Sequence, residues 1–285
     1  MLKKYYSLVK PGVLYGNAIT AAAGFLLASD GHVDWWLFVA LFIGTSLVIG
    51  SACALNNYLD RDIDSIMERT KSRAVASGAI PGYHAVILSV VLGIVGMAVL
   101  ALHTNWLVVI IGLIGFVDYV LLYGVWSKRM SIHGTLVGSI SGATPILAGY
   151  VAVSGTIDTG AIIVFAILFL WQMPEFYSIA IYRRNEYKAA GVPVISVVKG
   201  VNHTKLQIFL YTSAFFIATL LLTAYGYTGY AYVIIMAALG LYWLRLGYQG
   251  LKTAKSEPWA RKMFRFSLII LLAFSFLISI DAYLP

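Results

Sequence analysis

Nine long apolar segments constrain this chain more than any other feature of its sequence. Each is close to the ~20 residues that a helix needs to cross the hydrocarbon core of a bilayer. Because lipid satisfies no backbone hydrogen bonds, we expect these segments to be helices. The sequence therefore predicts an all-α, polytopic membrane protein that forms a single domain over residues 1–285. The expected spans are residues 13–29, 35–57, 84–103, 105–126, 132–153, 159–181, 206–225, 229–248 and 264–283.

The composition excludes a water-soluble core. Hydrophobic residues make up 60% of the chain and charged residues only 11%, whereas soluble domains carry about 25% charged residues. A net charge of +8 could indicate nucleic-acid binding, but in a membrane protein a basic excess marks the cytoplasmic loops. We therefore expect the lipid bilayer, and no nucleic acid, as the partner. One cysteine, Cys53, allows neither an internal disulfide nor a cysteine metal cluster.

The basic residues also orient the chain in the membrane. All 20 Lys and Arg lie at the N-terminus or in and beside the even-numbered connections, and the opposite side carries Asp30, Asp34, Asp158 and Asp281. The positive-inside rule then places the N-terminus and the basic connections in the cytoplasm. Nine spans put the C-terminus on the other side.

An acidic motif closes the second span. Asn56, Asp60 and Asp64 are spaced four residues apart, so they drift only about 80° around a helix and share one face. Oxygen ligands of this kind suit Mg²⁺, which usually binds one or two carboxylates together with substrate phosphates. The alternative is a solvated helix end whose acids pair with Arg61 and Arg69. Spacing leaves both open, although acids beside membrane spans are costly and tend to be functional.

Basic residues surround this motif on the same side of the membrane. A diphosphate held through Mg²⁺ keeps negative charge that Arg can bind as a planar fork and Lys as a point charge. Each base could instead serve only to set the topology. The candidates are Lys10, Arg69, Lys71, Arg73, Lys128 and Arg129.

Other polar residues near the spans are weaker candidates. Tyr119 and Tyr123 lie one helical turn apart and could face a developing cation or belong to the interfacial aromatic belt. His133 is the histidine best placed to touch a polar substrate, although a single histidine is more often structural. Glu175 and Asp118 are carboxylates inside spans, which makes them functional candidates by default.

Together these motifs resemble those of the UbiA-type intramembrane prenyltransferases. The acidic motif followed by Arg69, Thr70 and Arg73 resembles the first aspartate-rich motif of that family, and the nine-span layout is similar. Further motifs resemble the haem-farnesylating branch, and the resemblance covers essentially the whole chain. These motifs are residues 138–145, 171–174, 189–194 and 197–200, and Tyr123 with Lys128 and Arg129.

Three features bear on the choice of branch. Quinone-type relatives carry a second Asp-x-x-x-Asp motif after the sixth span, whereas residues 181–185 here contain no acid, as in the haem branch. That branch usually has His after Met-Pro, and this chain has Glu175, which puts that contact with haem in doubt. The usual Arg-Pro after the first motif is Arg73-Ala74 here, which alters the loop.

The resemblance implies a Mg²⁺-dependent reaction at the cytoplasmic side of the helix bundle. A farnesyl group passes from farnesyl diphosphate to a vinyl group of haem B, water adds, and haem O and diphosphate result. Haem B is a substrate in this scheme and not a cofactor. Asn56, Asp60 and Asp64 would hold the metal, with Lys71, Arg73 and Lys128 completing the catalytic set around the leaving diphosphate.

The same resemblance implies the substrate contacts and the setting. Arg183 and Lys199 are expected at the haem propionates and His133 at the iron. We expect a bacterial cytoplasmic membrane, with the product passed to a haem-copper terminal oxidase or a haem A synthase. The full set of implied substrate-binding residues is Lys10, Arg69, Tyr123, Arg129, His133, Glu175, Tyr177, Arg183 and Lys199.

Three other functions stay open at this point. A prenyltransferase for a quinone-type aromatic acceptor would share the fold but should carry the second acidic motif. A transporter would place polar groups near the bilayer midplane, where this chain offers only Asp118 and Glu175. A haem-binding subunit would not need the acidic face at Asn56, Asp60 and Asp64.

Overall fold

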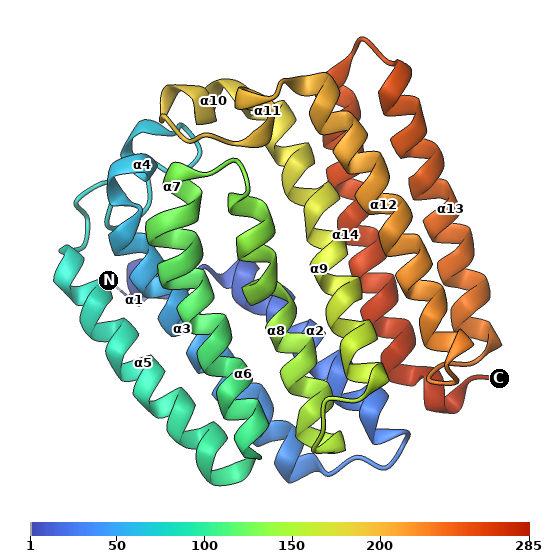
Figure 1. The fold of residues 1–285 in the computed structure, drawn as a ribbon. Coiled ribbons are helices and arrows are strands. Elements are labelled where there is room, and N and C mark those ends of the chain that lie inside the picture. The colour runs from blue at the N-terminus through green and yellow to red at the C-terminus, as the bar shows by residue number, and fades with distance from the viewer. Residues whose placement is uncertain (1) are drawn as a thin grey trace.

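Nine long helices stand side by side in the computed structural model, which describes residues 2–285 (Figure 1). Each is long and apolar enough to cross a membrane, which confirms the predicted all-helical, nine-span architecture. The spanning helices are α2 (Pro11–Ser29), α3 (Trp35–Leu59), α5 (Gly82–His103), α6 (Trp106–Val117) continued by η1 (Asp118–Ser127) and α7 (Lys128–Met130), α8 (Gly134–Ser154), α9 (Thr159–Tyr182), α12 (Val201–Ala224), α13 (Tyr230–Lys252) and α14 (Ser256–Ile280).

Helix α9 lies at the centre of one half of the bundle, where it packs against α8, α12 and α14. In the other half α3 packs against α5, and α2 joins the halves through α8 and α14. Helices α2 and α8 cross very closely, because a Cβ added at Gly149 would lie 2.0 Å from the Ala21 carbonyl oxygen. Small residues permit this approach, which is how helices associate in lipid.

Two spans begin earlier than the apolar pattern predicts. Helix α12 starts at Val201 instead of 206, and α14 starts at Ser256 instead of 264. The additional turns carry polar and basic side chains, such as His203 and Arg261. Hydropathy detects only the part of a helix that lies in hydrocarbon, so it misses turns that extend beyond it.

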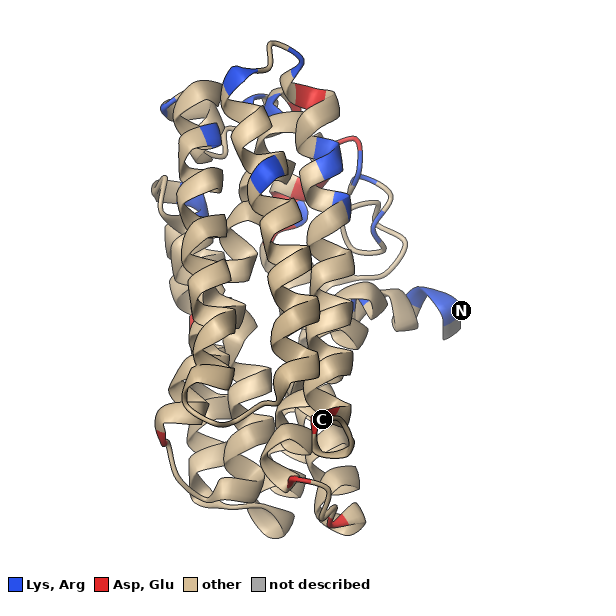
Figure 2. Ribbon diagram, turned by 90° about the vertical axis from the view of Figure 1, so that its right-hand side faces the viewer, with Lys and Arg blue, Asp and Glu red and all other residues tan. Residues whose placement is uncertain are grey.

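Charge is divided between the two ends of the bundle. Lys and Arg gather at one end and on the N-terminal helix, and the other end shows acidic positions (Figure 2). At that acidic end Asp34 caps α3 by accepting from the Trp36 and Leu37 amides, and Asp158 caps α9 by accepting from the Ala161 amide. The charge pattern behind the topology prediction is thus present in three dimensions.

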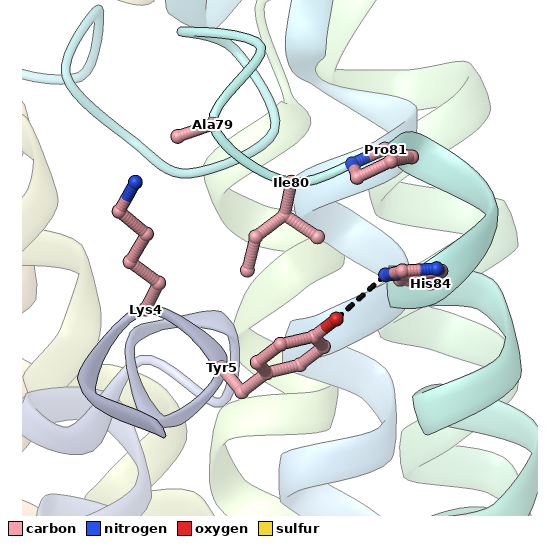
Figure 3. Close-up of a pocket in the computed structure, with 6 residues that line it drawn as sticks. All are labelled: Lys4, Tyr5, Ala79, Ile80, Pro81 and His84. Atoms are coloured by element: carbon pink, nitrogen blue, oxygen red, sulfur yellow. Dashed lines mark hydrogen bonds between the residues drawn. The ribbon is translucent and has the colours of Figure 1, made fainter. Parts of the chain in front are cut away.

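Short helices lie outside the spans: α1 (Leu2–Leu8), α4 (Arg61–Ile66), α10 (Arg184–Ala189) and α11 (Ile195–Val198). Leu8 anchors α1 by packing into a small core with Ala54 and Val75. The Tyr5 hydroxyl also lies 2.6 Å from Nδ1 of His84 at the start of α5, across a pocket of about 350 Å³ (Figure 3). These contacts fix the N-terminal segment beside α5.

The fourth span changes its helical form in the membrane. Helix α6 is α-helical, whereas the ten residues of η1 form a π-helix. The bond from the Lys128 amide to the Tyr123 carbonyl, five residues back, continues this pattern. π-Helical turns are rare and often occur at functional sites. The sequence analysis did not anticipate this change.

Candidate active site

The acidic motif forms where α3 passes into α4. The Asp60 amide donates to the Asn56 carbonyl at 2.9 Å, and the Asp64 amide donates to the Asp60 carbonyl at 2.8 Å. Helical hydrogen bonding therefore continues through the short break at Asp60. All three side chains are buried, with exposed fractions of 1–3%. The structure gathers them as the spacing predicts.

Each of these buried side chains meets a base from another part of the chain. Lys128 Nζ lies 2.5 Å from Asp60 Oδ2, and Arg73 Nη1 lies 2.7 Å from Asp64 Oδ2. Lys10, at the N-terminal end of α2, donates to the Asn56 side-chain carbonyl. We call these six residues the acid–base cluster.

The cluster differs from the ion pairing that the alternative interpretation of the motif implied. A solvated helix end would have paired the acids with Arg61 and Arg69. Instead the Arg61 guanidinium lies 4.2 Å from the centre of the Tyr58 ring and donates to the Tyr58 carbonyl. Among residues 2–285, no hydrogen bond or ion pair involves the Arg69 side chain, which is exposed. The close partners come from Arg73, which lies farther along the loop, and from Lys128.

The donor set fits a magnesium ion. Asp60 Oδ1 is buried and accepts no hydrogen bond in the described chain, with Arg129 Nη2 3.9 Å away. A buried carboxylate oxygen without a partner indicates a missing ligand or ion. Within residues 2–285 no group of three or more His, Cys, Asp or Glu side chains is arranged to hold a metal ion by itself. Two carboxylates and an amide suit Mg²⁺, which completes its shell with water and substrate phosphate.

The positive charges of Lys10, Arg73 and Lys128 lie close enough to repel one another. Burial, with a further contribution from the charge of Arg73, lowers the pKa of Lys10 to about 8. Lys128 also disfavours the charged form of Lys10. A bound anion would relieve this repulsion, because it would add negative charge among three converging cations.

Arg129 lies at the edge of the cluster. Its guanidinium binds Asp62 in two bonds of 2.7 and 2.8 Å and donates to the Leu59 carbonyl at 2.7 Å. This pair lowers the pKa of Asp62, chiefly through the hydrogen bonds. Bidentate pairs are geometrically specific, so Arg129 fixes the end of α7 against the α3–α4 junction.

Two other predicted bases lie apart from the cluster. Thr70 turns inward and its hydroxyl donates to the Asp64 carbonyl at 3.1 Å, so its neighbour Lys71 projects to the surface. There Lys71 pairs with Glu68 at 2.7 Å, and both side chains are exposed. Arg183 pairs with Glu186 at 2.5 Å. The structure therefore does not bring Lys71 to the acid–base cluster, and the expected contact of Arg183 with a haem propionate stays a prediction.

The π-helix brings two tyrosines toward the cluster. The centres of the Tyr119 and Tyr123 rings lie 5.9 Å apart, and Lys128 Nζ lies 6.0 Å from the centre of the Tyr123 ring. Gly124 of η1 lies beside Asn56 of α3, because a Cβ added at Gly124 would be at an ordinary contact distance of 3.7 Å from Asn56 Nδ2. The aromatic rings thus lie on the side of the cluster that faces the membrane interior.

A second pocket, of about 330 Å³, lies between α8, α9, α11 and α12. We call it the α9 pocket, because α9 packs against each of the other three helices. It brings together three residues that the sequence analysis assigned to substrate binding: His133, Tyr177 and Lys199. Apolar side chains of Ile132, Leu136 and Ile195 complete much of its lining.

The sequence analysis missed three residues of this pocket: His203, Gln207 and Tyr211. The spacing contained a signal for them. Counting from Lys199, polar or aromatic residues recur every four positions, which places His203, Gln207 and Tyr211 along one face of α12. Polar or aromatic residues spaced i, i+4 and i+8 in an otherwise apolar helix share one face, which indicates that this face contacts something other than lipid.

The two carboxylates inside the spans have different surroundings. Asp118 accepts a hydrogen bond of 3.0 Å from the Ser141 amide of α8, so it joins η1 to α8. Glu175 is buried in α9, and no described residue forms a hydrogen bond or ion pair with its side chain. It does not line the α9 pocket. The expected substrate contact of Glu175 stays a prediction.

Solved structures share this arrangement of helices. The fold superposes on digeranylgeranylglyceryl phosphate synthase with a TM-score of 0.81 and 22% identity, covering 99% of this chain and 98% of the other. It also matches a UbiA homologue from Archaeoglobus fulgidus, bound to GPP and Mg²⁺, with a TM-score of 0.74 and 13% identity over 96% and 99% of the two chains. These similarities confirm the fold.

Sequence comparison gives the family. The model of the UbiA prenyltransferase family matches residues 17–269. The protoheme IX farnesyltransferase of Yersinia pseudotuberculosis is 48% identical over 99% of this chain and 95% of that protein. That of Photorhabdus laumondii is 47% identical over 100% and 97%. With the acidic motif, its bases and the nine-span bundle in place, this chain belongs to the UbiA prenyltransferase family and, within it, to the protoheme IX farnesyltransferases.

Proposed function

We propose that this protein transfers the farnesyl group of farnesyl diphosphate to a vinyl group of haem B and adds water, giving haem O and diphosphate. The observation that carries the proposal is the acid–base cluster, in which buried carboxylates and bases converge beside an aromatic surface. The relatives named above, with nearly half of their residues identical, support haem as the acceptor over a quinone precursor or a transported solute.

The diphosphate end of the substrate would occupy the acid–base cluster. Asn56, Asp60 and Asp64 would hold Mg²⁺, which neutralises charge on the diphosphate and so improves it as a leaving group. Lys128 and Arg73 would then exchange their carboxylate partners for diphosphate oxygens. Fixed cations in a site of low dielectric constant stabilise a departing anion strongly.

The carbon chemistry would take place beside η1. The bond between C1 of the farnesyl group and the diphosphate oxygen breaks, and the electron pair leaves with the diphosphate. The faces of Tyr119 and Tyr123 would stabilise the allylic cation by cation–π attraction. The haem vinyl group then attacks C1, and the resulting cation takes up water and loses one proton. The net product carries one farnesyl group and one hydroxyl group more than haem B, and the proton released comes from the water.

The charge asymmetry supports an active site on the cytoplasmic side of a bacterial cytoplasmic membrane. The basic end of the bundle contains the acid–base cluster, and basic ends face the cytoplasm. The farnesyl chain and the macrocycle are both apolar, so the surrounding lipid can supply them. The product would pass to a haem-copper terminal oxidase or a haem A synthase.

The test is an assay of the purified protein with haem B, farnesyl diphosphate and Mg²⁺, read by mass spectrometry with and without a chelator. We expect a haem that has gained one farnesyl group and one hydroxyl group, formed only with free Mg²⁺. Prenylation of an aromatic quinone precursor instead of haem would contradict the proposal. Solute movement without diphosphate release would point to transport.

A further inference from the structure

The α9 pocket contains two imidazoles on opposite walls. His133 lies at the N-terminal end of α8, and His203 lies in the first turn of α12. Helix α9 packs against both α8 and α12 and thus separates these walls. No described residue forms a hydrogen bond or ion pair with either imidazole, and both are exposed. Imidazole nitrogens that are free in this way are available to a metal.

The remaining lining of the pocket suits a flat apolar molecule with an anionic edge. Tyr177 and Tyr211 meet edge to face, with ring centres 6.1 Å apart, and Tyr177 is almost fully buried. Lys199 also lines the pocket. Its side chain is exposed and has no acidic partner among residues 2–285. Ligand pockets typically combine apolar walls with a few fixed polar groups in a volume of ~300–1,000 Å³.

The position of the pocket relative to the acid–base cluster is favourable. His133 follows Lys128, which pairs with Asp60, by five positions in the chain. Consecutive Cα atoms are about 3.8 Å apart, so the two residues lie at most about 19 Å from each other. Both sites therefore lie at the same end of the bundle. A molecule held in the α9 pocket therefore lies at the end of the bundle where the farnesyl cation would form.

We infer that the α9 pocket is the haem site, in which His203 and His133 bind the iron from opposite faces and Lys199 pairs with a propionate. This inference rests on the proposed function for the identity of the acceptor. Histidine is a common axial ligand of haem iron, and a lysine supplies a point charge for a carboxylate. Ligation at the iron leaves the vinyl groups at the edge of the macrocycle free to react.

The experiment compares haem B with iron-free protoporphyrin IX on the purified full-length protein, without farnesyl diphosphate. The variants are His203→Ala and His133→Ala, and His84→Ala is the matched control. His84 also lines a pocket at the basic end, but in the other half of the bundle beside Tyr5 (Figure 3). Absorption and electron paramagnetic resonance spectra report the iron ligands independently of turnover.

We expect wild-type protein and His84→Ala to show low-spin, six-coordinate haem. Either pocket variant should become high-spin and bind haem B about tenfold or more weakly, while its affinity for protoporphyrin IX stays within about twofold. Added imidazole should restore the low-spin spectrum of His203→Ala. Lys199→Gln should weaken the binding of both porphyrins and leave the spin state unchanged.

Two results would overturn the inference. One is an unchanged low-spin spectrum in either pocket variant, and the other is an equal loss of both porphyrins in His203→Ala. The inference and the proposed function can fail separately. If a pocket variant still farnesylates haem and its spectrum is unchanged, only the assignment of the iron ligands is contradicted. If the protein binds low-spin haem but releases no diphosphate, only the proposed reaction is contradicted.

Discussion

The acid–base cluster and the α9 pocket lie at the same end of the bundle but prepare their polar groups in opposite ways. In the cluster, Asp60 and Asp64 are already paired with Lys128 and Arg73. In the pocket, the two imidazoles and Lys199 have no partner among the described residues. The cluster must therefore exchange partners to bind its substrate, whereas the pocket can accept a ligand without breaking an ion pair.

The difference follows from what each region buries. A carboxylate with 1% of its surface exposed, such as Asp60, cannot stay charged without a cation, because desolvation of an isolated charge is very costly. The bases that will later bind diphosphate thus serve first as counter-ions. The two imidazoles and Lys199 are exposed, so water can solvate them and the pocket has no need of internal partners.

Removal of Mg²⁺ should produce the largest difference in behaviour between the acid–base cluster and the α9 pocket. We expect a chelator to abolish farnesyl transfer, because the diphosphate loses its main neutralising charge. The haem-binding spectrum should not change, because the α9 pocket contains no ligand of that ion. Mass spectrometry of the product and a haem titration on the same sample check both parts. Loss of haem binding on chelation would show that the regions are coupled.

Asp60→Asn and Asp64→Asn should have the next largest effect on turnover. Each removes one carboxylate from a site with only two, and we expect turnover to fall by about 10³-fold while the protein stays folded in the membrane. The control is Glu68→Gln, which lies in the same connection but has an exposed side chain paired with the exposed Lys71. An exposed pair contributes little, so the control should lose less than about fivefold. Wild-type rates in Asp60→Asn or Asp64→Asn would remove the metal assignment.

Lys128→Met tests the exchange of partners. We expect turnover to fall by about 10²-fold, because one fixed cation is lost from the leaving group. The unpaired Asp60 carboxylate should then bind divalent cations more readily in the absence of substrate. Calorimetric titration with Mg²⁺ measures this change, and Lys128→Arg should restore part of the rate. If the variant bound Mg²⁺ more weakly than wild type, Lys128 would not compete with the metal.

Lys71→Ala should have the smallest effect. Lys71 is 53% exposed and pairs with an exposed glutamate in the same loop, so its charge is screened by water. We expect the rate and the apparent affinity for farnesyl diphosphate to change by no more than about twofold. Steady-state kinetics at two salt concentrations measures this. A loss comparable to that of Lys128→Met would mean that the loop closes over the substrate.

The sequence predicted the parts of the molecule that depend on local periodicity. Span number and helical class follow from hydropathy, and the shared face of Asn56, Asp60 and Asp64 follows from a spacing of four. The pairing of Asp60 with Lys128 does not, because it joins residues 68 positions apart through tertiary packing. The early starts of α12 and α14 were missed because their first turns lie outside the hydrocarbon core.

The α9 pocket shows a different limit. His133, Tyr177 and Lys199 were assigned individually, but nothing local relates α8 to α12. His203 has no second metal-binding side chain close to it in the sequence, so no local spacing marks it. In the structure the other histidine of the pocket, His133, lies in a different part of the chain, on the far side of α9. Long-range pairs of single ligands leave no trace in local spacing.

The π-helix makes the fourth span sensitive to the number of its residues as well as to their polarity. Each residue of an α-helix turns the chain by about 100°, and the π-helical stretch accommodates ten residues in a wider turn before Lys128. Deleting one residue from Asp118–Ser127 would let the segment relax to an α-helix and would swing Lys128 away from Asp60. A deletion that leaves the hydropathy of the span unchanged would thus separate the base from the acid, so insertions and deletions should be tolerated far less there than in the neighbouring α5.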